Sequence, residues 1–132
     1  MSRRELREQV FKLLFRIEFN DEEEMPEQME LFFEEKESME DSLKEEISRK
    51  YTAVLERKEE LDAMLNEKAT GWTVSRMGKV DLTIMRLALY EMLYDDTVPV
   101  SVAINEAVEL AKKFGQTDSS SFVNGVLAKF AD

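Results

Sequence analysis

One stretch of the sequence, residues 79–94, limits the possible fold more than any other. Its apolar side chains nearly encircle a helical wheel: Val80, Leu82, Ile84, Met85, Leu87, Ala88, Leu89, Tyr90, Met92 and Leu93. A helix that is apolar on all sides is stable in water only when other elements surround it. We therefore expect a buried central helix, stopped by Asp95 and Asp96.

The rest of the chain is predicted to supply the surrounding helices. Apolar residues recur at helical spacing in segments 4–19, 38–66 and 100–114. Pro26 is placed to open a short second helix, and the charged run 56–60 leaves open whether 38–66 is one helix or two. With only four glycines, two prolines and no alternating strand pattern, the 132 residues indicate one all-α domain.

The ends of the later helices carry recognisable signals. Pro99 suits a first helical turn, and Gly115 is expected to cap the helix that follows it. Asp118 or a following serine is expected to cap the last helix. Asn105 and Asn124 are poor helix formers inside helices, so we expect buried amides that bond neighbouring backbone.

The composition argues against an enzyme. The sequence has no cysteine and no histidine, which removes the usual nucleophiles, general bases and soft metal ligands. A solvated helix face explains every acidic cluster, so we expect no catalytic residue, no metal and no cofactor. Neither a membrane-spanning apolar stretch nor a signal peptide is recognisable, which favours the cytoplasm.

The net charge of −11 is unevenly distributed. Segment 21–46 holds 13 acids and 2 bases, so the remainder carries 16 of each. Residues 1–17 have 5 bases and 2 acids. Because salt screens charges beyond roughly 10 Å, this basic end can act as a phosphate site on an acidic protein. The acidic segment is expected to be a solvated face, or to limit nonspecific binding of phosphate-bearing ligands by repulsion.

Three stretches go beyond general pattern. They are Val102–Gly115 followed by Ser121–Leu127, the run Met85–Glu91, and the arginine-rich opening Arg3–Arg7. Together they resemble the NusB family, specifically over residues 72–130 and more loosely over 2–19. Segment 22–65 shows only a helical pattern.

The resemblance implies about seven helices in two subdomains, forming a single RNA-binding domain over 1–132. It implies a transcription antitermination factor that binds boxA-type single-stranded RNA of ribosomal transcripts together with NusE, the small-subunit ribosomal protein. This assembly would join the antitermination complex on RNA polymerase, without direct contact with DNA or membrane.

The resemblance also implies the site residues. Those expected to contact RNA are Arg3, Arg4, Arg7, Phe15, Asp118, Ser121 and Phe122. Arginine grips phosphate and stacks on bases, and single-stranded RNA is read on aromatic and guanidinium surfaces. Glu5 and Ser121 stand at positions that are often basic in the family, which predicts modest affinity.

Each of these residues also has a structural interpretation. Arg4 can pair with Glu8 on a solubilising helix end, Phe122 and Phe15 can belong to the core, and Asp118 can be a helix cap. Arg76 and Asp81 are expected to face NusE, and the alternative is exposed polar decoration.

Two other functions remain open at this stage. The chain can be a helical adaptor of the same fold that binds only protein. It can also be the non-catalytic part of a ribosomal RNA methyltransferase system, since NusB-like domains occur fused to such enzymes. The enzyme needs a further Rossmann-like domain with a Gly-rich loop, which these 132 residues lack.

Overall fold

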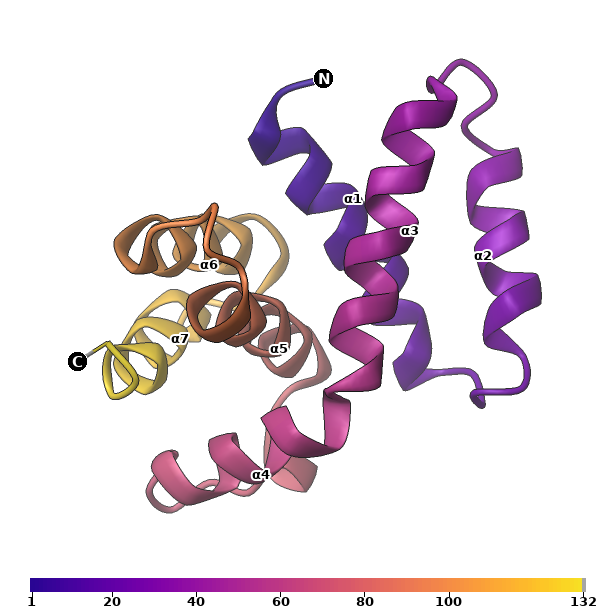
Figure 1. Ribbon diagram of the computed structural model, residues 1–132. Coiled ribbons are helices and arrows are strands. Elements are labelled where there is room, and N and C mark those ends of the chain that lie inside the picture. Colours follow the sequence, from indigo (N-terminus) through magenta and orange to yellow (C-terminus); the bar gives the residue numbers. More distant parts are fainter. Residues whose placement is uncertain (132) are drawn as a thin grey trace. The chain divides into compact units, whose positions relative to one another are not determined.

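The computed structural model describes residues 1–131, and in them it places seven α-helices and two short 3-10 helices (Figure 1). The bounds are α1 Arg3–Phe15, η1 Arg16–Glu18, α2 Met25–Glu34, α3 Asp41–Glu56, α4 Lys58–Lys68, η2 Val74–Arg76, α5 Lys79–Tyr94, α6 Val100–Phe114 and α7 Ser119–Ala128. The all-α prediction is confirmed. None of the helices in these residues is long and apolar enough to cross a membrane.

The chain divides into two compact units, Met1–Leu55 and Glu56–Asp132. The first contains α1, α2 and nearly all of α3. The second contains α4 to α7. The units are described separately below.

In the first unit, α1 begins where Ser2 caps it, since the Ser2 hydroxyl accepts a hydrogen bond from the Glu5 N–H at 3.1 Å. The predicted apolar stripe is buried, and it includes Leu6, Val10 and Leu14. The helix is shorter than the expected 4–19 because its last turn tightens into η1. Pro26 lies in the first turn of α2, as predicted.

The segment expected to form one or two helices forms two. α3 ends at Glu56, α4 begins at Lys58, and Arg57 between them leaves helical geometry with φ −104° and ψ 8°. The break lies inside the charged run 56–60. α2 and α3 are joined by a short connection, across which the chain reverses direction (Figure 1).

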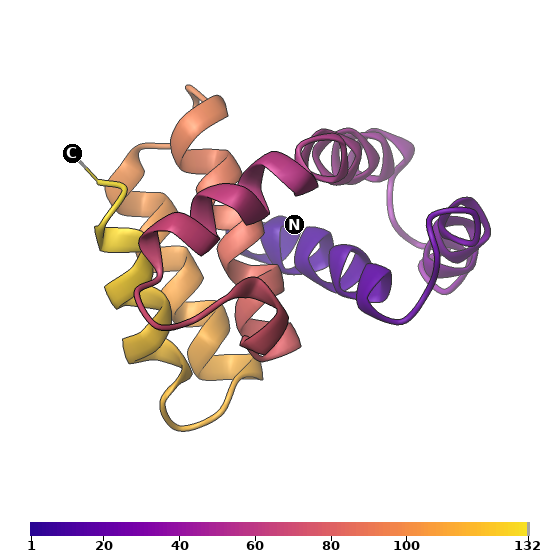
Figure 2. The ribbon, with the colours of Figure 1, turned by 90° about the horizontal axis from the view of Figure 1, so that it is seen from below.

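In the second unit, α5, α6 and α7 pack against one another, and α4 packs on α5 (Figure 2). α5 has the predicted bounds and is buried continuously from Leu82 to Leu89. Leu93, expected in the core, is 42% exposed near the end of the helix, whereas Glu91 is fully buried. The buried central helix is thus confirmed, except for its last turn.

One expectation about α6 and α7 is corrected. Asn105 and Asn124 are exposed, so the buried-amide prediction is wrong. Asn105 lies on the polar face of α6, where water can satisfy its side-chain amide and no buried partner is needed.

Gly115 does end α6, but in extended geometry with φ −92° and ψ −168°. Glycine is required there because an added Cβ would lie 2.5 Å from the Ser119 side chain and 2.7 Å from the Ala111 carbonyl oxygen. The Ser119 hydroxyl accepts a hydrogen bond from the Gln116 N–H at 2.9 Å, which fastens this turn to the start of α7.

Candidate nucleic-acid interface

The three predicted arginines lie together in the first two turns of α1. Arg3 and Arg4 are exposed and Arg7 is half-buried. The Arg3 guanidinium donates from Nη1 to both carboxylate oxygens of Glu46 on α3, at 2.8 and 3.0 Å. The Arg3 side chain is still 72% exposed. A phosphate that binds Arg3 therefore competes with a carboxylate of the acidic segment.

Phe15 lies at the other end of α1, in a short row of aromatic rings. Its ring stacks on Phe11 with centroids 6.0 Å apart, and it meets Phe19 edge-on at 5.1 Å. Phe11 is buried, Phe15 is half-buried and Phe19 is 62% exposed. Phe15 thus lies between a buried ring and an exposed one, at the border of the core and the surface. Sequence reasoning did not single out Phe19.

The other predicted RNA contacts lie at the start of α7, in the second unit. Asp118 occupies the N-cap position and is exposed, as is Ser121. Phe122 is half-buried, and its ring meets the ring of Trp72 edge-on with centroids 5.7 Å apart. Trp72 is 47% exposed. It was not predicted as a site residue, and the one signal in the sequence was a tryptophan directly after a glycine.

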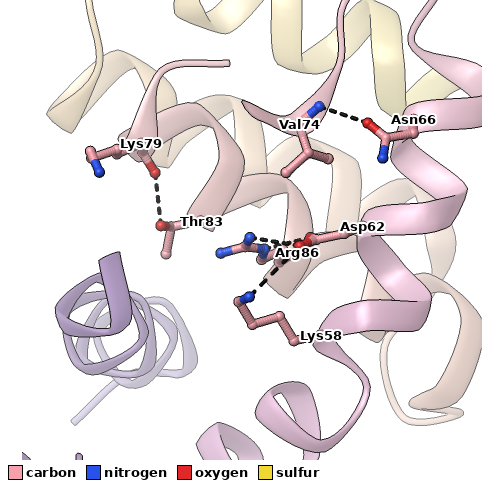
Figure 3. A network of polar contacts seen from close by, with 7 residues as sticks. All are labelled: Lys58, Asp62, Asn66, Val74, Lys79, Thr83 and Arg86. Atoms are coloured by element: carbon pink, nitrogen blue, oxygen red, sulfur yellow. Dashed lines mark hydrogen bonds and ion pairs between the residues drawn. The ribbon is translucent and has the colours of Figure 1, made fainter. Parts of the chain in front are cut away.

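A tight turn positions Trp72. The Trp72 N–H donates to the Ala69 carbonyl at 2.9 Å, and Gly71 between them has φ +81°, a conformation that favours glycine. Two residues after the tryptophan, the Val74 N–H donates to Asn66 Oδ1 at 2.7 Å (Figure 3). The segment that carries Trp72 is therefore held at both of its ends.

Trp72 and Phe122 line two neighbouring hollows. The first hollow, of about 410 Å³, is also lined by Lys79, Asp81 and Asp118. The second hollow, of about 270 Å³, is also lined by Ser121 and Lys129. The two differ in charge, because two carboxylates and one ammonium group border the first, whereas an ammonium group without a carboxylate borders the second.

The residues expected to face a protein partner lie in the same neighbourhood. Arg76 is exposed at the end of η2, with its guanidinium carbon 5.7 Å from the centroid of the Trp72 ring. Asp81 lies in the first turn of α5 and lines the first hollow together with Asp118. The second unit thus gathers the predicted partner residues beside Asp118, Ser121 and Phe122.

An ion pair beneath this surface joins α4 to α5 (Figure 3). Arg86 is 4% exposed and grips Asp62 with two hydrogen bonds of 2.7 and 2.8 Å. The Lys58 ammonium lies 3.9 Å from the same carboxylate. The pair joins the middle of α4 to the middle of α5, the two helices that the segment with Trp72 connects.

A second contact joins the far ends of the same helices. The Tyr94 hydroxyl donates to Glu60 Oε1 at 2.7 Å, and the Arg57 guanidinium carbon lies 3.8 Å from the Tyr94 ring centroid. The hydrogen bond to the carboxylate is the main cause that raises the pKa of Tyr94 above its ordinary value, and burial and the Glu60 charge act in the same direction. Arg57 opposes the shift.

Comparison with known proteins gives matches along the whole chain. The model of the NusB family matches residues 4–132. The transcription antitermination protein NusB of Agathobacter rectalis is 54% identical over 131 residues, which cover 99% of this chain and 100% of the relative. That of Lachnoclostridium phytofermentans is 49% identical, with both chains fully covered.

Solved structures agree with these matches. T. maritima NusB is 34% identical, with a TM-score of 0.86, and the match covers 99% of this chain and 91% of that one. A chain in a crystal structure of antitermination factors NusB and NusE with double-stranded RNA has a TM-score of 0.85 at 23% identity, over 98% of this chain and 95% of that one. At 23% identity, the similarity to the chain in the complex with NusE and RNA supports the fold alone.

Proposed function

Because the chain belongs to the NusB family, we propose that it is a transcription antitermination protein that binds boxA-type RNA of nascent ribosomal transcripts together with NusE. The observation that carries this proposal is the 54% identity to a transcription antitermination protein NusB over that protein's entire length. The proposed role is binding without catalysis, within the antitermination complex on RNA polymerase in the cytoplasm.

In the first unit, we assign phosphate binding to Arg3, Arg4 and Arg7. Their clustering in two helical turns supports this, since it concentrates positive charge on a chain that is acidic elsewhere. The planar guanidinium binds phosphate in a bidentate manner. Phe15, at the other end of α1, is assigned a contact with an unpaired base.

In the second unit, we assign RNA contacts to Ser121 and Phe122 near the start of α7. Backbone N–H groups in the first turn of a helix favour an anion, and a half-exposed aromatic ring favours a base. Asp118 lies at the same helix start, and its negative charge restrains the binding of phosphate.

Arg76 and Asp81 are assigned to the NusE interface. Both are charged residues near the exposed Trp72, one in η2 and one in the first turn of α5. In this proposal residues 1–132 act as one RNA-binding domain, to which both units contribute contacts.

The test is the binding of a labelled boxA RNA and a scrambled RNA, each with and without NusE, across a salt series. We expect preference for boxA RNA and tighter binding with NusE. Changing Arg3, Arg4 and Arg7 to alanine is expected to weaken binding more than tenfold. It is also expected to reduce the slope of log affinity against log salt by about 2, at roughly 0.7 per phosphate contact.

A matched control removes three positive charges from α3 instead, by changing Lys44, Arg49 and Lys50 to alanine. It is expected to weaken RNA binding by less than threefold. Equal, negligible binding to both RNAs in the presence of NusE would overturn the proposal. Binding to NusE with no binding to RNA would favour the helical adaptor.

A further inference from the structure

We propose that Trp72 contacts RNA, and that an unpaired base stacks on its indole in the second hollow, beside Lys129. This inference rests on the proposed function and adds a binding residue to it. The argument combines the exposure of Trp72, the way its position is fixed, and the charge around the two hollows.

The first observation is that the large aromatic side chain of Trp72 is partly packed against the protein and partly exposed to solvent. Trp72 is the only tryptophan of the chain, and 47% of it is exposed. Its ring meets Phe122 edge-on at 5.7 Å, so part of the indole is packed while the rest faces solvent. An unpaired base stacks on such a surface whatever its identity, because every base has a π-face.

The second observation is that the indole is held before any ligand binds. Gly71, with φ +81°, closes the turn, and the Val74 N–H bond to Asn66 fixes the segment after it. Directly after α7, the Lys129 ammonium donates to the Lys68 carbonyl at 2.9 Å and to Thr70 Oγ1 at 3.4 Å. A fixed platform loses little conformational entropy when it binds, which favours affinity.

The third observation is the charge of the two hollows that Trp72 lines. The first hollow has Asp81 and Asp118 in its wall against the single cation Lys79, so its excess of negative charge disfavours the phosphates beside a bound base. In the part of the chain that the structure describes, Lys129 is the one charged residue that lines the second hollow. Charge complementarity with RNA therefore favours the second hollow.

The second hollow is also continuous with the RNA contacts already assigned to α7, since Ser121 and Phe122 line it. At about 270 Å³ it is smaller than the roughly 300–1,000 Å³ of pockets that enclose drug-sized ligands, which suits a single base rather than a larger ligand.

The first test uses Trp72 itself as the reporter. The chain, with NusE, is titrated with boxA RNA, and tryptophan fluorescence is followed beside the anisotropy of labelled RNA. A parallel titration of Trp72→Phe supplies the blank, because that variant has no tryptophan and any remaining change comes from the partner or the RNA. We expect the fluorescence of Trp72 to be quenched with the same midpoint as RNA binding.

The second test uses variants. Trp72→Ala is expected to weaken boxA binding by about tenfold, in line with alanine substitutions of residues that stack on bases. Trp72→Phe, which keeps a π-face, is expected to stay within about threefold. Leu93→Ala is the matched control, since it removes an apolar side chain of similar exposure, 42%, at the opposite end of α5 from the hollows.

The role of Lys129 is tested with variants that remove or keep its positive charge. Lys129→Gln is expected to lower the slope of log affinity against log salt by about 0.7, which corresponds to one phosphate of a single strand. Lys129→Arg is expected to keep the slope. Lys112→Gln is the matched control, because Lys112 is exposed on α6 and pairs with Glu109.

The outcomes separate the two proposals. One outcome is that the unaltered chain binds RNA without a change in Trp72 fluorescence, and that Trp72→Ala binds RNA with full affinity. This outcome overturns the base-stacking assignment and leaves the proposed function standing. Loss of NusE binding in Trp72→Ala, with RNA binding unchanged, overturns it in favour of a protein contact. An unaltered chain that binds no RNA even with NusE overturns both.

Discussion

Arg3 and Glu46 form an ion pair in which one guanidinium nitrogen, Nη1, donates to both carboxylate oxygens, at 2.8 and 3.0 Å. Glu46 is the last acid of the segment that carries the net negative charge of the chain. Glu46→Gln is expected to tighten RNA binding two- to fivefold, because exposed ion pairs contribute at most about 1 kcal/mol. The measurement is the affinity for boxA RNA and for random RNA.

Glu45→Gln is the control for this variant, since it makes the same change of charge one residue away on α3. An equal gain in both variants would mean that the field of the acidic segment acts, rather than release of Arg3. No gain in either would exclude a restraining role for these two carboxylates.

The buried pair of Arg86 and Asp62 is expected to dominate the attachment of α4. Asp62→Ala leaves a guanidinium that is 4% exposed without its bidentate partner, so the free energy of unfolding should fall by about 3 kcal/mol. Lys58→Ala, which removes the more distant cation at 3.9 Å, should cost less than about 1 kcal/mol. Urea denaturation measures both, and similar losses in the two variants would contradict this ranking.

Gly115 and Gly125 give a second matched pair. Gly115→Ala forces a methyl group to within 2.5 Å of Ser119, so it should destabilise the chain and disturb the start of α7. Gly125 is helical with nothing within 4 Å of its added Cβ, so Gly125→Ala should stabilise by roughly 0.5–1 kcal/mol. Thermal denaturation distinguishes them, and a neutral Gly115→Ala would show that the turn has room to relax.

Tyr94 is expected to titrate above the ordinary tyrosine range. Its pKa is raised in the folded chain chiefly by the hydrogen bond to Glu60. The neutral phenol is therefore stabilised, and this stabilisation is present in full below the ordinary pKa and is lost as the pH rises through the raised one. Tyrosinate absorbance, with Tyr94→Phe for assignment, should show that Glu60→Ala lowers the pKa. An unchanged midpoint would mean that the hydrogen bond is not its cause.

Much of the fold was predictable because the decisive patterns are local. The bounds of α5 follow from apolar residues around the whole wheel, and the break at Arg57 follows from a run of charges. The NusB resemblance came from motifs in α1, α5, α6 and α7, and not from segment 22–65. The wrong predictions concern the burial of single side chains rather than the helical period. Asn105 and Asn124 are exposed, although asparagine within a helix was interpreted as a sign of a buried amide.

The predicted site residues follow from the resemblance to the family's motifs, whereas Trp72 was not among the predictions. Its position depends on the φ of Gly71, on the hydrogen bond that the Val74 N–H donates to Asn66, and on Phe122, which lies in a helix far away in the sequence. Trp72 lies in a turn, where the periodic pattern of apolar residues that identifies a helix gives no information. The contact between Trp72 and Phe122 is a product of tertiary packing, which a single sequence does not reveal.

The break at Arg57 has a consequence for the dynamics of the chain. α4 is fastened to α5 by the Asp62 and Glu60 contacts and belongs to the second unit, although in sequence it follows α3 almost without interruption. Amide hydrogen exchange should therefore change abruptly at residue 57, with α4 exchanging at the rate of its spatial neighbours. Two helices that are adjacent in the sequence would then open as parts of two different cooperative units.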